Sequence, residues 1–174
     1  MTHHLQFQAG IVIFKAEHTM EDRDKNKEQL ISELQATRLG LHETGELFRT
    51  LFYLSTDAIV VYDIQGRALY TNPAFSWMFG WTFEEVKGKR IDFVPESEIP
   101  HTMEAIRLII DKGSKLTGFE TKRFTKEGAM VDVTINAGRY HDSDGEAAGM
   151  LVILKDITER NQVYQRLSEL ENEE

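Results

Sequence analysis

The stretch of sequence that decides the fold runs from residue 57 to residue 75: Asp57-Ala58-Ile59-Val60-Val61-Tyr62-Asp63-Ile64-Gln65-Gly66-Arg67-Ala68-Leu69-Tyr70-Thr71-Asn72-Pro73-Ala74-Phe75. A β-branched run at 58–63, a glycine-containing turn at 64–67 and a second strand-like run at 68–72 predict a β-hairpin. Pro73 suits the first position of a helix, because its φ angle is fixed and its missing N–H needs no partner. Asn72 is a typical N-cap. The stretch therefore predicts a hairpin that leads directly into a helix.

Downstream of this stretch, helix signals precede strand signals. Thr82 and Glu85 have the spacing of a capping box, and the segment 101–111 has a broad apolar face that ends before Gly113. Three strand-like runs separated by turn residues follow at 118–125, 130–140 and 148–155. This order predicts an α+β domain in which a five-stranded antiparallel sheet carries short helices on one face.

The N-terminal segments predict structure outside this domain. Residues 1–15 contain an alternating, then β-branched run, which predicts one strand or the stub of an upstream region. Residues 16–46 have the composition of an amphipathic helix. Steps of four and three residues form a heptad pattern that joins Leu30, Leu34, Thr37, Leu41, Thr44, Phe48 and Leu51. The pattern predicts a coiled-coil-like helix that forms a homodimer, and the alternative is a single helix packed on its own domain.

The C-terminal segment predicts a second flanking helix. Residues 159–174 place Val163, Leu167 and Leu170 at steps of four and three. Just before it, the strand-like run 150–154 is apolar on both faces, so its outer side needs a cover. We expect the N-terminal helix, or that of a partner chain, to provide it.

Composition excludes several classes of function. The chain has 174 residues and a mass of 20.0 kDa, enough for one domain and its flanking segments. A net charge of −9 argues against nucleic-acid partners and anionic membranes. The sequence has no cysteine, which excludes disulfides, cysteine-ligated metals and a cysteine nucleophile. Because no apolar run approaches the roughly 20 residues that span a bilayer, and no signal peptide is evident, we expect a cytoplasmic protein without a membrane span.

Five motifs, taken in order, resemble the PAS domain family of bacterial signalling proteins such as sensor histidine kinases. They are residues 57–66, Tyr70–Phe75, Phe79–Lys89, the turn Lys126–Gly128 and the closing Asp156-Ile157-Thr158-Glu159-Arg160. The resemblance covers about residues 47–160. It implies a PAS domain at 47–158, followed by a signalling helix at 159–174 that acts on a downstream effector domain or partner protein.

The resemblance also implies where a ligand and a signal would act. In this family the ligand lies between the inner face of the sheet and the short helices, and the closing motif Asp156, Ile157 and Thr158 joins the domain to its signalling helix. Asp156 or Thr158 is expected to cap that helix. The pocket candidates are Tyr62, Asn72, Phe75, Phe79, Trp81, Phe93, Thr121, Arg123, Thr134 and Asn136. The alternative is that the aromatic residues form plain core and that several polar ones face solvent.

Cofactor signals are weak. Light-sensing relatives that bind flavin covalently need a cysteine, and Ile91 occupies that position. His101 is the one histidine placed to ligate haem, whereas a gas-facing arginine of haem sensors is replaced by Phe119. We therefore expect no resident cofactor and no bound metal, with haem or non-covalent flavin, and a ligand-free protein–protein adaptor, as alternatives. Metalloprotease, phosphate-loop and nucleophile-elbow motifs are missing from the sequence, which argues against an enzyme.

Overall fold

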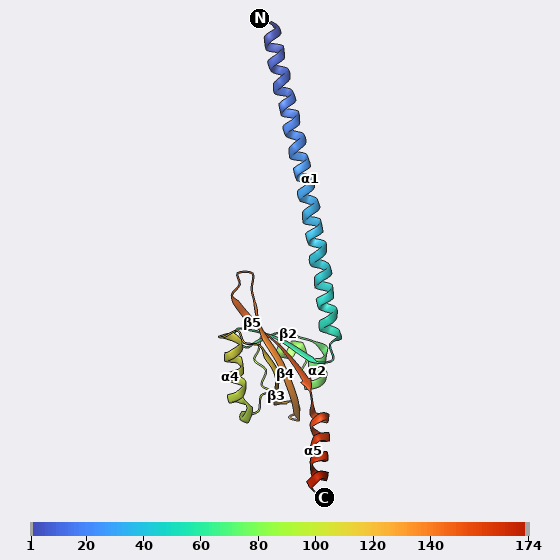
Figure 1. The fold of residues 1–174 in the computed structure, drawn as a ribbon, viewed down its shortest axis with the longest axis vertical. Coiled ribbons are helices and arrows are strands. Elements are labelled where there is room, and N and C mark those ends of the chain that lie inside the picture. The colour runs from blue at the N-terminus through green and yellow to red at the C-terminus, as the bar shows by residue number, and fades with distance from the viewer. Residues whose placement is uncertain (1, 173–174) are drawn as a thin grey trace. The chain divides into compact units, whose positions relative to one another are not determined.

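A computed structural model describes the backbone of residues 2–172 and the side chains of residues 27 and 29–170 (Figure 1). The chain divides into two compact units, Met1–Thr50 and Leu51–Glu174. The elements in chain order are α1 (Thr2–Leu54), β1 (Ala58–Asp63), β2 (Ala68–Thr71), α2 (Pro73–Phe79), α3 (Phe83–Val86), a 3-10 turn η1 (Glu96–Glu98), α4 (Ile99–Ile110), β3 (Leu116–Phe124), β4 (Met130–His141), β5 (Ala147–Asp156) and α5 (Thr158–Asn172).

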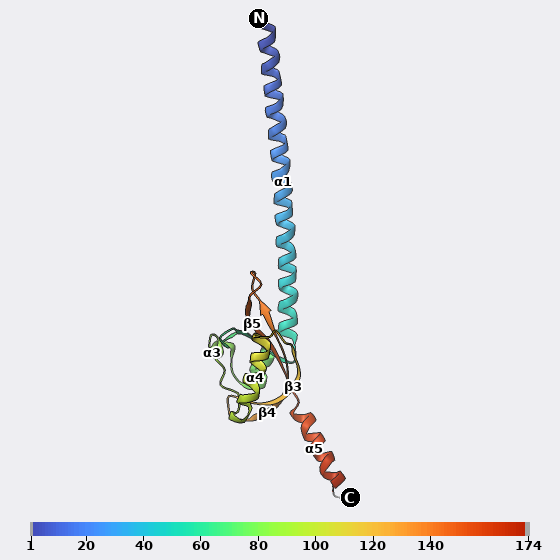
Figure 2. The same ribbon diagram turned by 60° about the vertical axis from the view of Figure 1, so that its left-hand side comes forward.

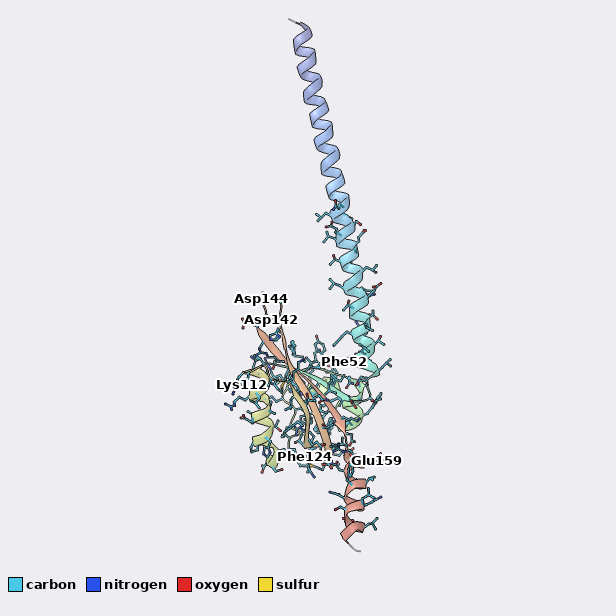
Figure 3. All side chains as sticks on the ribbon, viewed as in Figure 1. Phe52, Lys112, Phe124, Asp142, Asp144 and Glu159 are labelled. Atoms are coloured by element: carbon cyan, nitrogen blue, oxygen red, sulfur yellow. The ribbon has the colours of Figure 1, made fainter. Side chains whose placement is uncertain are left out.

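The second unit is built on one five-stranded antiparallel sheet with the strand order β2-β1-β5-β4-β3. The predicted α+β architecture is confirmed. The last strand, β5, lies in the centre, where it pairs with β1 through Val60 and Val152 and with β4 through Ile135 and Leu154. Figures 1 and 2 show α4 on one face of this sheet, and Figure 3 places Asp142 and Asp144 at the tip of the β4–β5 hairpin.

Alternation along the strands sorts side chains between the two faces of the sheet. In β4, Val133 and Ile135 are buried, whereas Asn136 is exposed. The buried face joins aromatic and aliphatic side chains from the helical segments in one core, which contains Phe75, Phe79, Val86, Phe93 and Ile109. On the other face, Leu151 and Ile153 of β5 are only half-buried. The prediction that a further helix covers them stays a prediction.

The predicted strand within residues 1–15 is wrong, because these residues belong to α1 from Thr2 onward. An isolated strand leaves its N–H and C=O groups without a neighbouring strand, whereas a helix satisfies its own backbone. The helix also continues past the predicted end at residue 46 to Leu54. Within its described part, the heptad residues Leu30, Leu34, Leu41, Phe48 and Leu51 are exposed.

Asn72 connects four segments of the second unit through one buried side chain. Its Oδ1 accepts hydrogen bonds from the backbone N–H of Ile59 in β1 (2.8 Å) and of Phe75 in α2 (3.1 Å). Its Nδ2 donates to the carbonyl oxygens of Asp57 (2.9 Å) and of Phe52, in the last turn of α1 (3.2 Å). The predicted N-cap role is confirmed. The amide also orders the chain entering the sheet, a role the sequence pattern did not reveal.

We expect Asn72→Ala to lower the free energy of unfolding by about 2–4 kcal/mol, because it leaves several buried backbone groups without partners. Urea unfolding followed by circular dichroism measures the change. Asn136→Ala is the matched control, since this exposed amide accepts one hydrogen bond, from the N–H of Gly118. We expect the control to cost less than about 1 kcal/mol. Equal losses in the two variants would show that the four-way bonding of Asn72 contributes nothing special.

Glu85 connects α3 to the turn between β3 and β4 through its carboxylate. The predicted capping box is present, with the Thr82 backbone N–H donating to Glu85 Oε2 (2.9 Å). Lys126 binds the other carboxylate oxygen, Oε1. The hydrogen bond from Lys126, followed by those from Thr82, lowers the pKa of Glu85 from its ordinary 4.5 to about 2. The stabilisation from this carboxylate is therefore present above about pH 4.5 and is lost as the pH falls toward 2.

We expect the Glu85 carboxyl to titrate near pH 2 in side-chain NMR spectra of the folded protein. Lys126→Met should move this midpoint up toward the ordinary value, because the variant removes the strongest hydrogen bond to the carboxylate. Lys122→Met is the control, since Lys122 pairs with Asp132 instead (3.4 Å). An unchanged Glu85 midpoint in Lys126→Met would refute the assigned cause.

Candidate functional site

A cavity of about 390 Å³ lies between the inner face of the sheet and α4. Its volume falls within the range of roughly 300–1,000 Å³ that is typical of small-molecule sites. The lining includes exposed residues, namely Ile64 and Gln65 from the β1–β2 turn and Met103 from α4. Most of the wall is aliphatic or aromatic, formed by Ile91, Phe93, Val94, Ile106, Ile109, Ile110, Leu116, Phe119, Ile135, Ala137, Met150, Val152 and Leu154.

Arg123 brings a positive charge into this apolar wall. Its side chain points inward from β3 and is 3% exposed. Nη1 donates to Thr121 Oγ1 (3.0 Å) and to the Lys122 carbonyl (2.7 Å), and Nη2 donates to Thr102 Oγ1 (3.2 Å). The guanidinium carbon lies 5.6 Å from the centre of the Phe93 ring, a cation–π contact. These contacts hold the group in place without neutralising its charge.

The nearest acid reaches Arg123 only through a hydroxyl. Thr121 Oγ1 donates to Glu98 Oε2 (2.7 Å), and among the described side chains no carboxylate lies within ion-pairing distance of Arg123. Burial lowers the pKa of Arg123, while Tyr62 and Glu98 oppose that shift. Arginine stays protonated even so, because its ordinary pKa lies far above neutral pH. The cavity wall therefore contains a buried cation with an incomplete counter-charge.

Tyr62 adds a phenol hydroxyl to the same wall. The side chain points inward from β1, is 7% exposed and lines the cavity. Burial raises the pKa of this phenol well above its ordinary value, and the positive charge of Arg123 partly offsets the rise. The hydroxyl has no hydrogen-bond partner among the residues that the structure describes. Thr71 Oγ1, and not this oxygen, is the fully buried side-chain atom without a partner there, so the Tyr62 hydroxyl is accessible from the cavity. It is thus a protonated donor that remains available to a molecule in the cavity.

Of the ten predicted pocket residues, the cavity wall contains three, namely Tyr62, Phe93 and Arg123. Phe75 and Phe79 are fully buried core, and Trp81 packs its ring edge against Phe93 (6.4 Å between centroids). Thr121 does not line the cavity but supports Arg123. Asn72, Thr134 and Asn136 are also absent from the wall. The Asn72 side chain is hydrogen-bonded to backbone groups. Thr134 and Asn136 lie on the opposite face of the sheet, because side chains alternate along β4.

The residues named for the two alternative cofactors lie away from the cavity wall. His101, the predicted haem ligand, is exposed and does not line the cavity. The amide side chains of Asn72 and Asn136, which would suit a flavin ring, lie outside the cavity wall. Thr102 and much of the apolar wall from α4 line the cavity although they were not predicted as pocket residues. The broad apolar face predicted for residues 101–111 was the available signal.

The predicted junction joins α5 to β4 as well as to β5. Asp156 Oδ1 accepts from the Thr158 N–H (2.8 Å), which is the predicted capping role. Thr158 Oγ1 instead accepts from the Asp132 N–H (3.1 Å), and the Asp132 carbonyl accepts from the Ile157 N–H (2.9 Å). Ile157 is buried. The start of α5 is therefore bonded to a strand that also contributes to the cavity wall.

Polar side chains extend this attachment into the first turn of α5. Asn161 Nδ2 donates to Asp132 Oδ2 (3.2 Å). Arg160 Nη2 forms an ion pair with Glu120 Oε1 of β3 (2.7 Å). Both partners of that ion pair are close to half exposed, so its net contribution to stability is small. Asp132, in contrast, takes part in three hydrogen bonds of this attachment.

Comparison with known proteins agrees with the fold and the closing motif. A family model described as PAS fold matches residues 52–162, which includes the sheet, the cavity and the junction. The chain belongs to the PAS family. Within the part of the chain that the structure describes, no helix is both long and apolar enough to cross a membrane.

The PAS domain is homologous to those of sensor histidine kinases. Sensor histidine kinase TmoS of Ectopseudomonas mendocina is 23% identical over 80% of this chain, and the histidine-protein kinase AtoS of Escherichia coli is 25% identical over 76%. Sporulation kinase C of Bacillus subtilis is 23% identical over 83%. The chain spans 14%, 21% and 33% of the length of these relatives, respectively.

Two solved structures share the fold. A PAS domain from Colwellia psychrerythraea superimposes with a TM-score of 0.59 at 26% identity, over 66% of this chain and 97% of that domain. An RNA-binding light-oxygen-voltage receptor superimposes with a TM-score of 0.62 at 27% identity, over 74% of this chain and 37% of the receptor. Both likenesses support the PAS fold of the matched part of this chain.

Proposed function

We propose that this chain is a sensory module of a signal transduction protein, in which a ligand in the cavity changes the strands that hold α5. One observation carries the proposal: β4 and β5 supply both the cavity wall and the attachment of α5. Ile135 and Ala137 of β4, and Leu154 of β5, line the cavity. Asp132 of β4 and Asp156 of β5 bond the start of α5. A displacement of these strands at the cavity therefore acts on the helix.

The attachment of α5 has a strength suited to switching. A capping hydrogen bond contributes about 0.5–2 kcal/mol, which the differential affinity of a ligand for two states can overcome. The relatives are kinases much longer than this chain, so we propose that α5 acts on an effector domain of that kind or on a partner protein. In this proposal the chain itself is a sensor rather than an enzyme, it works in the cytoplasm, and its ligand is a diffusible small molecule.

The proposal also includes homodimerisation through α1. Leu34 and Leu41 are 62% and 70% exposed, so these apolar side chains are free to pack against a second helix. The flanking helix of a second copy would bury these residues in a two-stranded coiled coil. Such a dimer would place two α5 helices under the control of two cavities.

We expect Asp156→Ala to raise amide hydrogen exchange in residues 159–170, because the variant removes the cap at the start of α5. In the wild-type chain, binding of any cavity ligand should change exchange in the same residues, whereas in Asp156→Ala that response should be lost. Asp144→Ala is the control, since this residue lies at the tip of the β4–β5 hairpin (Figure 3). Unchanged exchange in α5 on ligand binding would refute the proposed route.

We expect Leu34→Glu combined with Leu41→Glu to convert a dimer to a monomer in light scattering, because two charges on each helix would face each other in the seam. Leu39→Glu is the matched control, since Leu39 is 60% exposed on the same helix but lies outside the heptad pattern. A wild-type chain that is monomeric, or a control that dissociates equally, would contradict the dimer.

A further inference from the structure

We propose that the cavity binds an amphiphilic carboxylic acid, with its carboxylate held by Arg123 and Tyr62 and its apolar body packed against α4 and the inner face of the sheet. The inference rests on the proposed sensory function and adds the chemical class of the ligand. It requires an anion-binding end, a hydrogen-bond donor beside that end, and an apolar remainder.

The anion-binding end is Arg123. A buried charge normally has an oppositely charged partner, because removing it from water is costly. Arg123 is 3% exposed, yet its closest acid, Glu98, is reached only through the Thr121 hydroxyl. A guanidinium has five N–H donors, and the contacts to Thr121, Lys122 and Thr102 use three of them. Within the described structure two donors remain, the number that a carboxylate accepts in a bidentate contact.

The second donor is the Tyr62 hydroxyl. The Tyr62 side chain is 7% exposed, and its hydroxyl, which is accessible from the cavity, has no hydrogen-bond partner among the described residues. A molecule in the cavity can therefore accept a hydrogen bond from it. Tyr62 and Arg123 both line the cavity, although they come from β1 and β3, two strands that are not neighbours in the sheet. In the proposal the ligand carboxylate accepts hydrogen bonds from both side chains.

The rest of the cavity wall favours a ligand that is apolar apart from its acidic group. Away from Arg123, Tyr62 and Thr102, the buried wall consists of aliphatic and aromatic side chains such as Ile109, Leu116 and Val152. The polar groups of the β1–β2 turn are already engaged, since Asp63 binds Arg67 (2.7 Å) and Arg90 binds the Gln65 carbonyl (3.0 Å). A sugar or nucleotide would leave many polar atoms unpaired against this wall. One acidic group on a hydrocarbon or aromatic body matches the cavity better.

Affinity measurements with matched probe pairs test this assignment on the full 174-residue chain. Hexanoate, decanoate and 2-naphthoate are each compared with their methyl esters by isothermal titration calorimetry at neutral pH. We expect at least one acid to bind about tenfold more tightly than its ester, because only the acid gains the charge-assisted hydrogen bonds. If no acid binds more tightly than its ester, the proposed carboxylate site is wrong.

Four variants test which residues cause the tighter binding of the acid. Arg123→Gln should abolish the difference in affinity between acid and ester. Tyr62→Phe should lower the affinity for the acid about fivefold and leave the affinity for the ester unchanged. Glu98→Gln should strengthen acid binding, because it removes the competing negative charge near Arg123. Lys112→Gln, which removes an exposed cation just after α4, should change neither affinity. If Arg123→Gln does not fold, the Tyr62 and Glu98 variants decide the question, and unchanged acid affinity in both would overturn the proposal.

The same titrations separate failure of this inference from failure of the proposed function. Hydrogen exchange in residues 159–170 is measured with each saturating probe. An ester that binds as tightly as its acid and still changes exchange in α5 overturns the carboxylate assignment and supports the sensory role. An acid that binds with the expected preference but leaves α5 unchanged supports the assignment and overturns the sensory role.

Discussion

The four hydrogen bonds of the Asn72 side chain are the constraint on which the domain depends. They fix the end of α1, the entry into β1 and the start of α2 with respect to one another. Because this amide is buried, water cannot replace any of its partners. One side chain therefore holds together the β1–β2 hairpin, which contributes Tyr62 to the cavity wall, and α2, which contributes Phe75 to the core.

Local signals explain what the sequence predicted well. The hairpin, the helix that follows Asn72 and the alternation in β4 each depend on residues near one another in the chain. The prediction of a strand within residues 1–15 was wrong because an alternating pattern does not by itself provide a neighbouring strand to pair with. Arg123 was predicted as a pocket residue among ten, but nothing local showed that it is buried. Its burial depends on Thr102 and Phe93, which contact it only in the folded domain.

The family resemblance predicted where a cavity would lie, but the residues of its wall could not be predicted from the sequence, because a cavity is defined by volume that side chains leave empty. The same aromatic residues suit a filled core and a lined pocket. Phe79 and Phe93 are both buried members of the core, yet only Phe93 lines the cavity wall. What distinguishes them is the path of the segment between α3 and α4, and that path follows from tertiary contacts such as the hydrogen bond from the Phe124 N–H to the Phe93 carbonyl (2.8 Å).

The central position of β5 has a consequence for how the domain is made. β1 pairs with β5, which lies about ninety residues later in the chain, so the sheet contains contacts between residues far apart in sequence. The sheet is incomplete without β5, because this strand lies between β1 and β4. The residues that directly follow β5 form α5. The helix proposed to transmit the signal thus continues from the last strand needed to complete the sensor domain.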